Sequence, residues 1–89
     1  MRYEWDSAKD SNNLAKHKIS LAAAGLLFDG NERISADSRF DYGERRLIAR
    51  GLIAGRLFVC VFVDRGEARR VISLRKANRR EIDAYRKGL

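Results

Sequence analysis

The sequence predicts a single α+β domain over residues 1–89, with an antiparallel sheet of about four strands, two N-terminal helices and one C-terminal helix. Three observations support this fold class. A chain of 89 residues leaves no room for a second hydrophobic core. Helix-capping residues precede the segments near both ends of the chain, whereas the middle contains apolar runs separated by glycine turns. Because those turns are short, consecutive strands are expected to be antiparallel.

The N-terminal third begins with a short edge strand at residues 3–5 and continues with two helices. Asp6 is a favourable N-cap for a helix over residues 7–17, which gathers cations toward its C-terminal end. Ser20 caps a second helix over residues 21–28. This second helix is apolar nearly all round, so it is expected to be buried, and Asp29-Gly30-Asn31 ends it.

Strands are expected at residues 33–37, 45–53, 57–64 and 69–75. An acidic loop around residues 37–43, Ala54-Gly55 and Arg65-Gly66 separate them. Residues 57–63 are all apolar without alternation, which is typical of a central strand covered on both faces, so Cys60 is interpreted as a core residue. Asn78 and Glu81 have capping-box spacing and begin the final helix.

Alternation along two strands predicts a sheet face lined by arginine. Ile72 and Leu74 are expected to point into the core, and the side chains then expected on the other face are Val71, Ser73 and Arg75. On the strand at 45–53, one face carries Arg46, Ile48 and Arg50. Arginines at such positions either border an anion site or pair with carboxylates from the acidic half of the chain.

The charge distribution favours a polyanionic partner. The formal net charge is +7, and residues 1–44 are net −2 whereas residues 45–89 are net +9. Fourteen of the 19 cations are arginine, whose planar guanidinium binds phosphate through two hydrogen bonds and stacks on bases. A basic surface that serves only solubility, or one that binds an acidic protein, explains the same numbers.

Composition also argues against several classes of protein. A single cysteine, Cys60, cannot form an intrachain disulfide, which favours a reducing compartment. The longest apolar run, residues 57–63, is far shorter than the ~20 residues that span a bilayer, and no signal-peptide cleavage pattern follows residues 19–28. Acidic residues show no metal-ligand spacing. We therefore expect a cytoplasmic protein that uses no membrane, metal or cofactor.

Several short motifs follow one another along the chain in a specific order. The N-terminal motifs are Tyr3-Glu4-Trp5-Asp6, Asn13-Leu14-Ala15-Lys16-His17 and Ile19-Ser20. The later ones are Tyr42-Gly43-Glu44 with Arg46, Gly51-Leu52-Ile53-Ala54-Gly55-Arg56, Arg65-Gly66, and Arg70-Val71-Ile72-Ser73-Leu74-Arg75-Lys76-Ala77 through Glu81 to Tyr85. In their order and spacing, these motifs resemble the BrnT family, the toxin half of a bacterial type II toxin–antitoxin pair. This resemblance implies a compact RelE-like fold and ribonuclease activity that arrests translation. It also implies neutralisation by BrnA, a ribbon-helix-helix antitoxin that binds operator DNA.

The residues themselves allow metal-independent RNA cleavage, because the 2′-hydroxyl of RNA can act as the nucleophile and cations can stabilise the pentavalent phosphate. The catalytic candidates are Arg46, Arg75, His17 and Tyr85. The candidates for RNA binding are Lys16, Arg50, Lys76, Arg79 and Arg80.

Three of the four catalytic candidates also have a specific structural interpretation. Arg46 has the spacing to pair with Glu44, and His17 is placed to cap the end of a helix. Tyr85 is equally explained as a core or interface ring, and Glu81 as the cap partner of Asn78. The alternative function is accordingly a non-catalytic module, whose basic half binds nucleic acid or docks an antitoxin.

Overall fold

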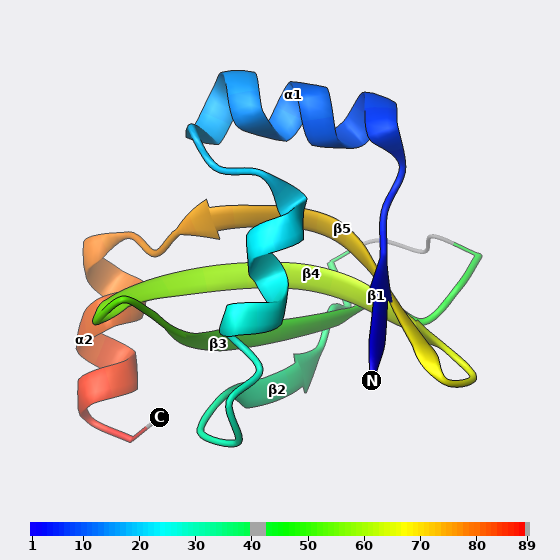
Figure 1. The fold of residues 1–89 in the computed structure, drawn as a ribbon. Coiled ribbons are helices and arrows are strands. Elements are labelled where there is room, and N and C mark those ends of the chain that lie inside the picture. Colours follow the sequence, from blue (N-terminus) through cyan, green and yellow to red (C-terminus); the bar gives the residue numbers. More distant parts are fainter. Residues whose placement is uncertain (40–42, 89) are drawn as a thin grey trace.

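The computed structural model describes residues 1–39 and 43–88, which form one mixed sheet with three helical segments (Figure 1). The elements in chain order are β1 (Arg2–Glu4), α1 (Ser7–His17), the 3₁₀ helix η1 (Leu21–Leu26), β2 (Arg33–Ala36), β3 (Leu47–Ile53), β4 (Arg56–Arg65), β5 (Ala68–Lys76) and α2 (Arg79–Arg86). Their order across the sheet is β1-β5-β4-β3-β2. In Figure 1, η1 crosses one face of the sheet and α1 lies along the β5 edge.

The α+β class is confirmed, but the strand arrangement differs from the expected antiparallel sheet of about four strands. The sheet has five strands, and β1 pairs with β5 in parallel, with Arg2 opposite Ala68. The other three strand pairs are antiparallel, as their short connections predict. This parallel pairing joins the first strand to one that begins more than sixty residues later, so no local turn signal in the sequence could indicate it.

The helix caps confirm the predicted starts. The Asp6 carboxylate accepts from the backbone amide of Lys9 at 3.0 Å, and the Ser20 hydroxyl accepts from that of Ala22 at 3.2 Å. Asn78 and Glu81 form a complete capping box at the start of α2. The second helix, however, ends at Leu26 and is 3₁₀ in type.

The 3₁₀ geometry of η1 has a physical reason in the spacing of its apolar residues. Leu21, Ala24 and Leu27 recur every third residue and are all fully buried. A 3₁₀ helix has three residues per turn and therefore directs all three side chains toward the sheet. The helix lies so close to β3 that a Cβ atom on Gly51 would approach the Leu27 Cγ to 2.9 Å. Glycine at position 51 is therefore needed for η1 to pack.

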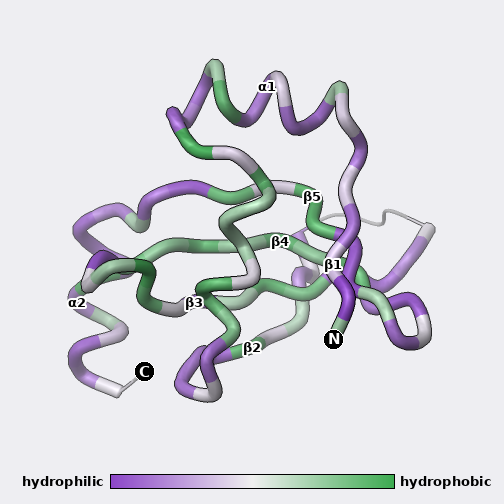
Figure 2. Tube along the Cα trace, viewed as in Figure 1, coloured by the Kyte–Doolittle hydropathy of each residue, from purple (hydrophilic) through white to green (hydrophobic). Residues whose placement is uncertain are grey.

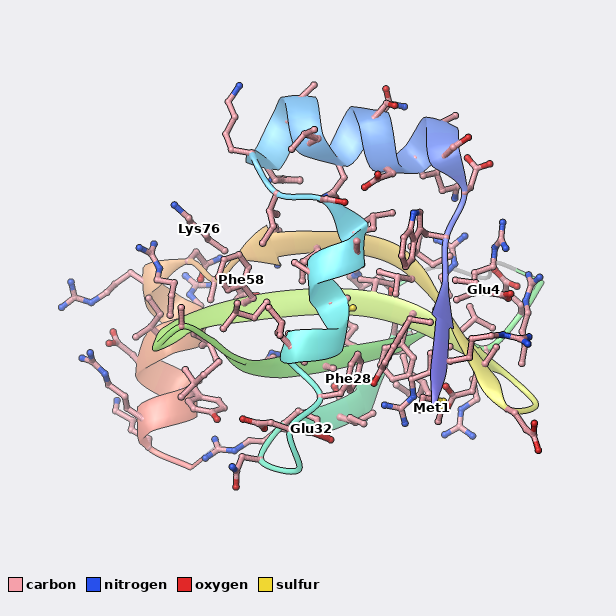
Figure 3. The ribbon with its side chains drawn as sticks, in the orientation of Figure 1. Met1, Glu4, Phe28, Glu32, Phe58 and Lys76 are labelled. Atoms are coloured by element: carbon pink, nitrogen blue, oxygen red, sulfur yellow. The ribbon has the colours of Figure 1, made fainter. Side chains whose placement is uncertain are left out.

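The central strand is β4, as its unbroken apolar run predicts. On one face Phe62 is fully buried beneath η1, and Phe28, which follows η1, points toward the sheet and meets the Phe62 ring edge-on at 5.2 Å (Figure 3). On the other face Leu57 and Val59 pack against α2. Figure 2 shows the strong hydrophobicity of β4. Cys60 is fully buried as expected, and burial raises the pKa of its thiol to about 12.

A β-bulge changes the predicted alternation of β5. The register shifts between Val61 and Phe62, so that Val71 and Leu74 both point into the core while Ile72 is partly exposed. The expectation that Ile72 is a core residue and Val71 is not was therefore wrong. Beyond the bulge, the side chains of β5 alternate between the two faces as predicted.

The edge of β5 that faces away from β4 pairs with two different parts of the chain. Its first residues pair with β1, and the Asn13 side chain takes over at Leu74. The Asn13 amide donates to the Leu74 carbonyl at 2.8 Å and to the Ile19 carbonyl at 2.9 Å, while its oxygen accepts from the Leu74 amide at 3.1 Å. These bonds fix the C-terminal turn of α1 beside the end of β5.

Candidate functional site

The sheet face opposite η1 carries a cavity of about 430 Å³ between the end of α1 and the start of α2. We call it the basic pocket, and its lining residues are Lys16, His17, Arg39, Ile48, Arg50, Val59, Val61, Ser73, Arg75 and Glu81. Strands β3 and β4 supply an apolar floor, and the surrounding side chains are mainly cationic. Among the lining residues that the structure describes, Glu81 is the only carboxylate.

The end of α1 brings Lys16 and His17 to the pocket. The helix stops at Lys18, which has a left-handed conformation with φ of 62° and donates its backbone amide to the Leu14 carbonyl at 2.9 Å. Together with Asn13 on β5, this termination sets the position of the last helical turn. Lys16 and His17, which the sequence places at a helix end, therefore lie near strand residues that come almost sixty positions later in the chain.

Arg75 is held in a defined orientation by Glu81. Its Nη1 and Nη2 atoms donate to the two carboxylate oxygens of Glu81 at 2.8 and 2.9 Å. The Glu81 Oε1 atom also accepts from the backbone amide of Asn78 at 2.8 Å. The hydrogen bond from Arg75 and, more weakly, that from Asn78 lower the pKa of the Glu81 carboxyl, against the opposing effect of burial. One carboxylate thus caps α2 and orients a pocket arginine.

His17 lies in an environment that favours its neutral form. Burial lowers the pKa of the imidazole below its usual 6.5, and the positive charges of Lys16 and Arg75 lower it further. At neutral pH the ring therefore has a nitrogen able to accept a proton. This is the state that a general base requires before reaction.

The pocket cations differ in how far they are neutralised. Within residues 1–39 and 43–88, neither Lys16 nor Arg50 forms an ion pair, although Arg50 donates to the Ser35 hydroxyl at 3.2 Å. Arg39 makes two hydrogen bonds to the buried carboxylate of Asp37, at 2.8 and 2.9 Å. The balance of the pocket is positive, so its chemistry suits an anionic group such as phosphate.

Residues 5–81 match the sequence model of a protein family described as "Ribonuclease toxin, BrnT, of type II toxin-antitoxin system". The chain belongs to the BrnT family. The match covers α1, the whole of β2–β5 and the start of α2, and so includes every residue that lines the basic pocket. A comparison with curated protein sequences gave no match.

The BrnT family is a family of ribonuclease toxins, and its place in type II systems implies an antitoxin partner. Among the described residues no helix is long and apolar enough to cross a membrane. In the same part of the chain, no group of three or more His, Cys, Asp or Glu side chains is arranged to hold a metal ion.

Of the nine site residues expected from the sequence of this BrnT chain, the basic pocket brings together four. These are Lys16, His17, Arg50 and Arg75. Arg46 does not line the pocket. Its Nε atom lies 3.5 Å from a carboxylate oxygen of Glu44, the pairing that the sequence left open.

The remaining predicted residues lie around α2. Figure 3 shows Lys76 at the end of β5, directed away from the sheet. Arg79 pairs with Asp83 across one turn of α2, at 3.4 Å, and Arg80 lies on the same helix. Tyr85 packs against the Leu57 and Val59 cluster, and the Arg33 guanidinium lies 4.2 Å from its ring centroid.

Arg39 is the pocket cation that sequence reasoning missed. It follows β2 within the segment interpreted as an acidic separating loop, of which residues 40–42 lie outside the described part of the chain. Asp37 accepts from the backbone amide of Arg39 at 3.3 Å, as an Asx turn requires. The sequence signal that could have indicated Arg39 is an aspartate two residues before it, at the end of a strand.

Proposed function

We propose that this chain is an endoribonuclease toxin that cleaves RNA without a metal ion and thereby inhibits translation. The observation that carries the proposal is the basic pocket, where the only histidine of the chain lies with its pKa lowered beside Lys16 and Arg75. A phosphodiester is the anion that such a mixture of cations and a neutral imidazole suits best. The cytoplasm is the compartment in which we expect this activity.

Arg75 and Arg50 are the phosphate clamp in this mechanism. The two side chains reach the same cavity from β5 and β3, the outer neighbours of central β4. Charge on the nonbridging oxygens increases as the phosphate becomes pentavalent, so a preoriented guanidinium stabilises the transition state more than the ground state. Glu81 provides the orientation, because it fixes the Arg75 fork before substrate binds.

His17 and Lys16 perform the proton transfers. Neutral His17 removes the proton from the 2′-hydroxyl, whose oxygen attacks the adjacent phosphorus. The bond from phosphorus to the 5′-oxygen breaks, and the Lys16 ammonium donates a proton to that leaving oxygen. The products are a 2′,3′-cyclic phosphate and a 5′-hydroxyl, and a final proton exchange with water restores both side chains.

The remaining predicted basic residues and Tyr85 act at the edges of this site rather than on the reacting phosphorus. Lys76, Arg79 and Arg80 hold the RNA backbone beyond the pocket through electrostatic contacts. Arg46, which pairs with Glu44, supports the same field from outside the lining. Tyr85 contributes a ring surface near α2 and leaves acid–base chemistry to His17 and Lys16.

We further propose that the fold is RelE-like and that a BrnA-like ribbon-helix-helix antitoxin neutralises the toxin by covering the basic pocket. A polycationic cavity is complementary to acidic side chains, and a partner that occupies it excludes RNA by competition. Operator DNA then binds through the antitoxin in the complex. If RNA binds the complex as tightly as it binds the free toxin, inhibition is conformational and the occlusion proposal fails.

The test uses purified, antitoxin-free protein and a long single-stranded RNA. Defined fragments with cyclic phosphate ends are expected, with equal yield in the presence and absence of EDTA. A matched RNA with a 2′-deoxy substitution at the cleaved nucleotide should resist cutting there. Binding without fragments would instead identify the alternative, a non-catalytic nucleic-acid-binding module. Cutting of the deoxy substrate, or loss of cutting with EDTA that magnesium restores, would disprove the arginine mechanism.

A further inference from the structure

A second cavity lies beside the basic pocket on the same face of the sheet. We call it the side groove. It has a volume of about 520 Å³ and runs between strands β2 and β3 and helix α2. Its lining residues are Arg33, Ile34, Ser35, Arg50, Arg80, Glu81, Ala84 and Tyr85. Arg50 and Glu81 line both cavities, so the two adjoin each other.

The side groove contains a guanidinium group stacked on an aromatic ring. The Arg33 guanidinium carbon lies 4.2 Å from the Tyr85 ring centroid, and Arg33 Nη1 donates to the Tyr85 carbonyl oxygen at 2.8 Å. These two contacts fix the guanidinium plane against α2. Ala84, the residue before Tyr85, leaves open space next to this stack because its side chain is a single methyl group.

The electrostatics at the rim of the groove match a nucleic acid strand better than a cationic or neutral small molecule. Arg33, Arg50 and Arg80 surround it, and Glu81, the one carboxylate among the described lining residues, is already bonded through both oxygens to Arg75. A planar apolar group with phosphates on either side satisfies both the flat interior and the cationic rim.

We propose that the side groove is a nucleobase subsite, which stacks a base of the RNA strand whose phosphate occupies the basic pocket. This inference rests on the proposed function in taking RNA as the ligand of the pocket. Stacking on a guanidinium or aromatic plane is available to every base, whereas the width of the groove beside Ala84 limits the size of the base. Tyr85, Arg33 and Ala84 are then the residues that determine which nucleotide is preferred beside the cleaved bond.

The test measures binding, so that it does not depend on cleavage. The probes are a fluorescent single-stranded decamer of 2′-O-methyl RNA, which lacks the nucleophile, and a decamer of abasic units with the same number of phosphates. Wild-type protein is expected to bind the base-bearing probe about tenfold to a hundredfold more tightly than the abasic one. The variant Ala84→Phe fills the groove and should lose most of this ratio while its affinity for the abasic probe stays the same.

Two further variants make the result specific. Ala8→Phe places the same bulk on the exposed surface of α1 and should keep the wild-type ratio. Arg33→Lys retains the positive charge but removes the guanidinium plane, and it should reduce the ratio even if Ala84→Phe does not fold. Circular dichroism and melting temperature establish that each variant is folded.

The outcomes separate the subsite from the nuclease. If Ala84→Phe and Arg33→Lys are folded and both keep the wild-type ratio, the subsite does not exist. If Ala84→Phe leaves this ratio intact but abolishes association with the antitoxin, the groove is a protein interface and the proposal is overturned. Base-dependent binding that both variants reduce, in a protein that cuts no RNA, supports the subsite and disproves only the proposed nuclease activity.

Discussion

The two faces of the sheet have different physical tasks. The face beneath η1 contains fully buried apolar side chains such as Phe62 and Leu74, and it provides most of the stability. The opposite face is only partly covered by α2, and it presents Arg50, Ser73 and Arg75 over an apolar floor. Because one face supplies the core, the other can hold cations that contribute little to packing. Adjacent residues on one strand therefore belong to different functional classes.

The largest expected effect is on stability, and it comes from two neighbours in β4. Phe62→Ala removes a fully buried ring and should lower the free energy of unfolding by about 3–5 kcal/mol. Val61→Ala, on the pocket side of the same strand, should lower it by about 1 kcal/mol. Urea denaturation of both variants measures the difference. Equal losses would mean that the two faces share the core.

For Arg75, on the pocket face, we expect a large effect on activity and a small effect on stability. Arg75→Ala should reduce the rate of RNA cleavage about 10²–10³-fold, since it removes a preoriented charge from the transition state. Its ion pair with Glu81 is more than one third exposed on the arginine side, so the loss of stability should be only about 1 kcal/mol. Arg70→Ala, on the same strand and outside the pocket, is the matched control. A variant that unfolds would show that Arg75 is structural.

The pH dependence of cleavage tests His17. The neutral imidazole is the proposed base, and its pKa in the folded protein lies below 6.5. Activity should therefore be constant near neutrality and should fall about tenfold per pH unit once the pH passes below that pKa.

A titration of the His17 ring by NMR checks the same shift without any cleavage assay. Arg75→Ala should raise the His17 pKa, because the Arg75 charge is one of the causes that lower it. The Arg70→Ala control should leave it unchanged. If the His17 pKa in Arg75→Ala equals that of wild type, the charge of Arg75 does not influence His17.

Asn13 connects α1 to the edge of β5, and its loss should affect the whole molecule moderately. Asn13→Ala leaves the Leu74 amide and carbonyl and the Ile19 carbonyl without their side-chain partner, so we expect a loss of about 1–3 kcal/mol. Asn12→Ala changes the adjacent exposed residue and should be nearly neutral. Thermal unfolding of the pair gives the comparison. Similar melting temperatures for the two would show that water replaces the Asn13 contacts.

The smallest effect is expected for Glu81→Gln, which keeps an oxygen for the Asn78 amide but removes the charge opposite Arg75. The pKa of Glu81 is lowered in the folded protein, so its charge stabilises the fold above its ordinary pKa of 4.5. That contribution disappears as the pH falls through the lowered pKa. The free energy of unfolding of wild type should exceed that of Glu81→Gln by about 1 kcal/mol or less at pH 7, and the two should converge once the pH has fallen below the lowered pKa. A constant difference across this range would assign the stabilisation to something other than charge.

The sequence predicts those parts of the fold that depend on neighbouring residues. The caps at Asp6, Ser20 and Asn78 require only a few consecutive positions, and the hairpin at Ala54-Gly55 requires two residues with positive φ, which both adopt. The central position of β4 follows from its uninterrupted apolar run. Each of these features is an interaction within about one turn or one strand.

Features that join distant segments could not be predicted in the same way. The parallel pairing of β1 and the bulge opposite Ile72 depend on which strands meet and in what register. Arg39, which follows the edge strand β2, lines the pocket together with residues of β3, β4 and β5, and this meeting depends on the strand order. For the candidate site, residue type and strand alternation singled out Arg50 and Arg75, whereas their proximity to His17 required the tertiary structure.

The parallel pairing of β1 with β5 also has a consequence for how the protein is made. A ribosome completes Arg2–Glu4 before any of the strand that these residues pair with, so the first segment waits for a loop of more than sixty residues to close. The same delay applies to the basic pocket, which combines Lys16 and His17 with Arg75 and Glu81. A nascent chain that ends before Arg75 lacks one arginine of the proposed clamp and the carboxylate that orients it. The basic pocket is therefore complete only when almost the whole domain has left the ribosome.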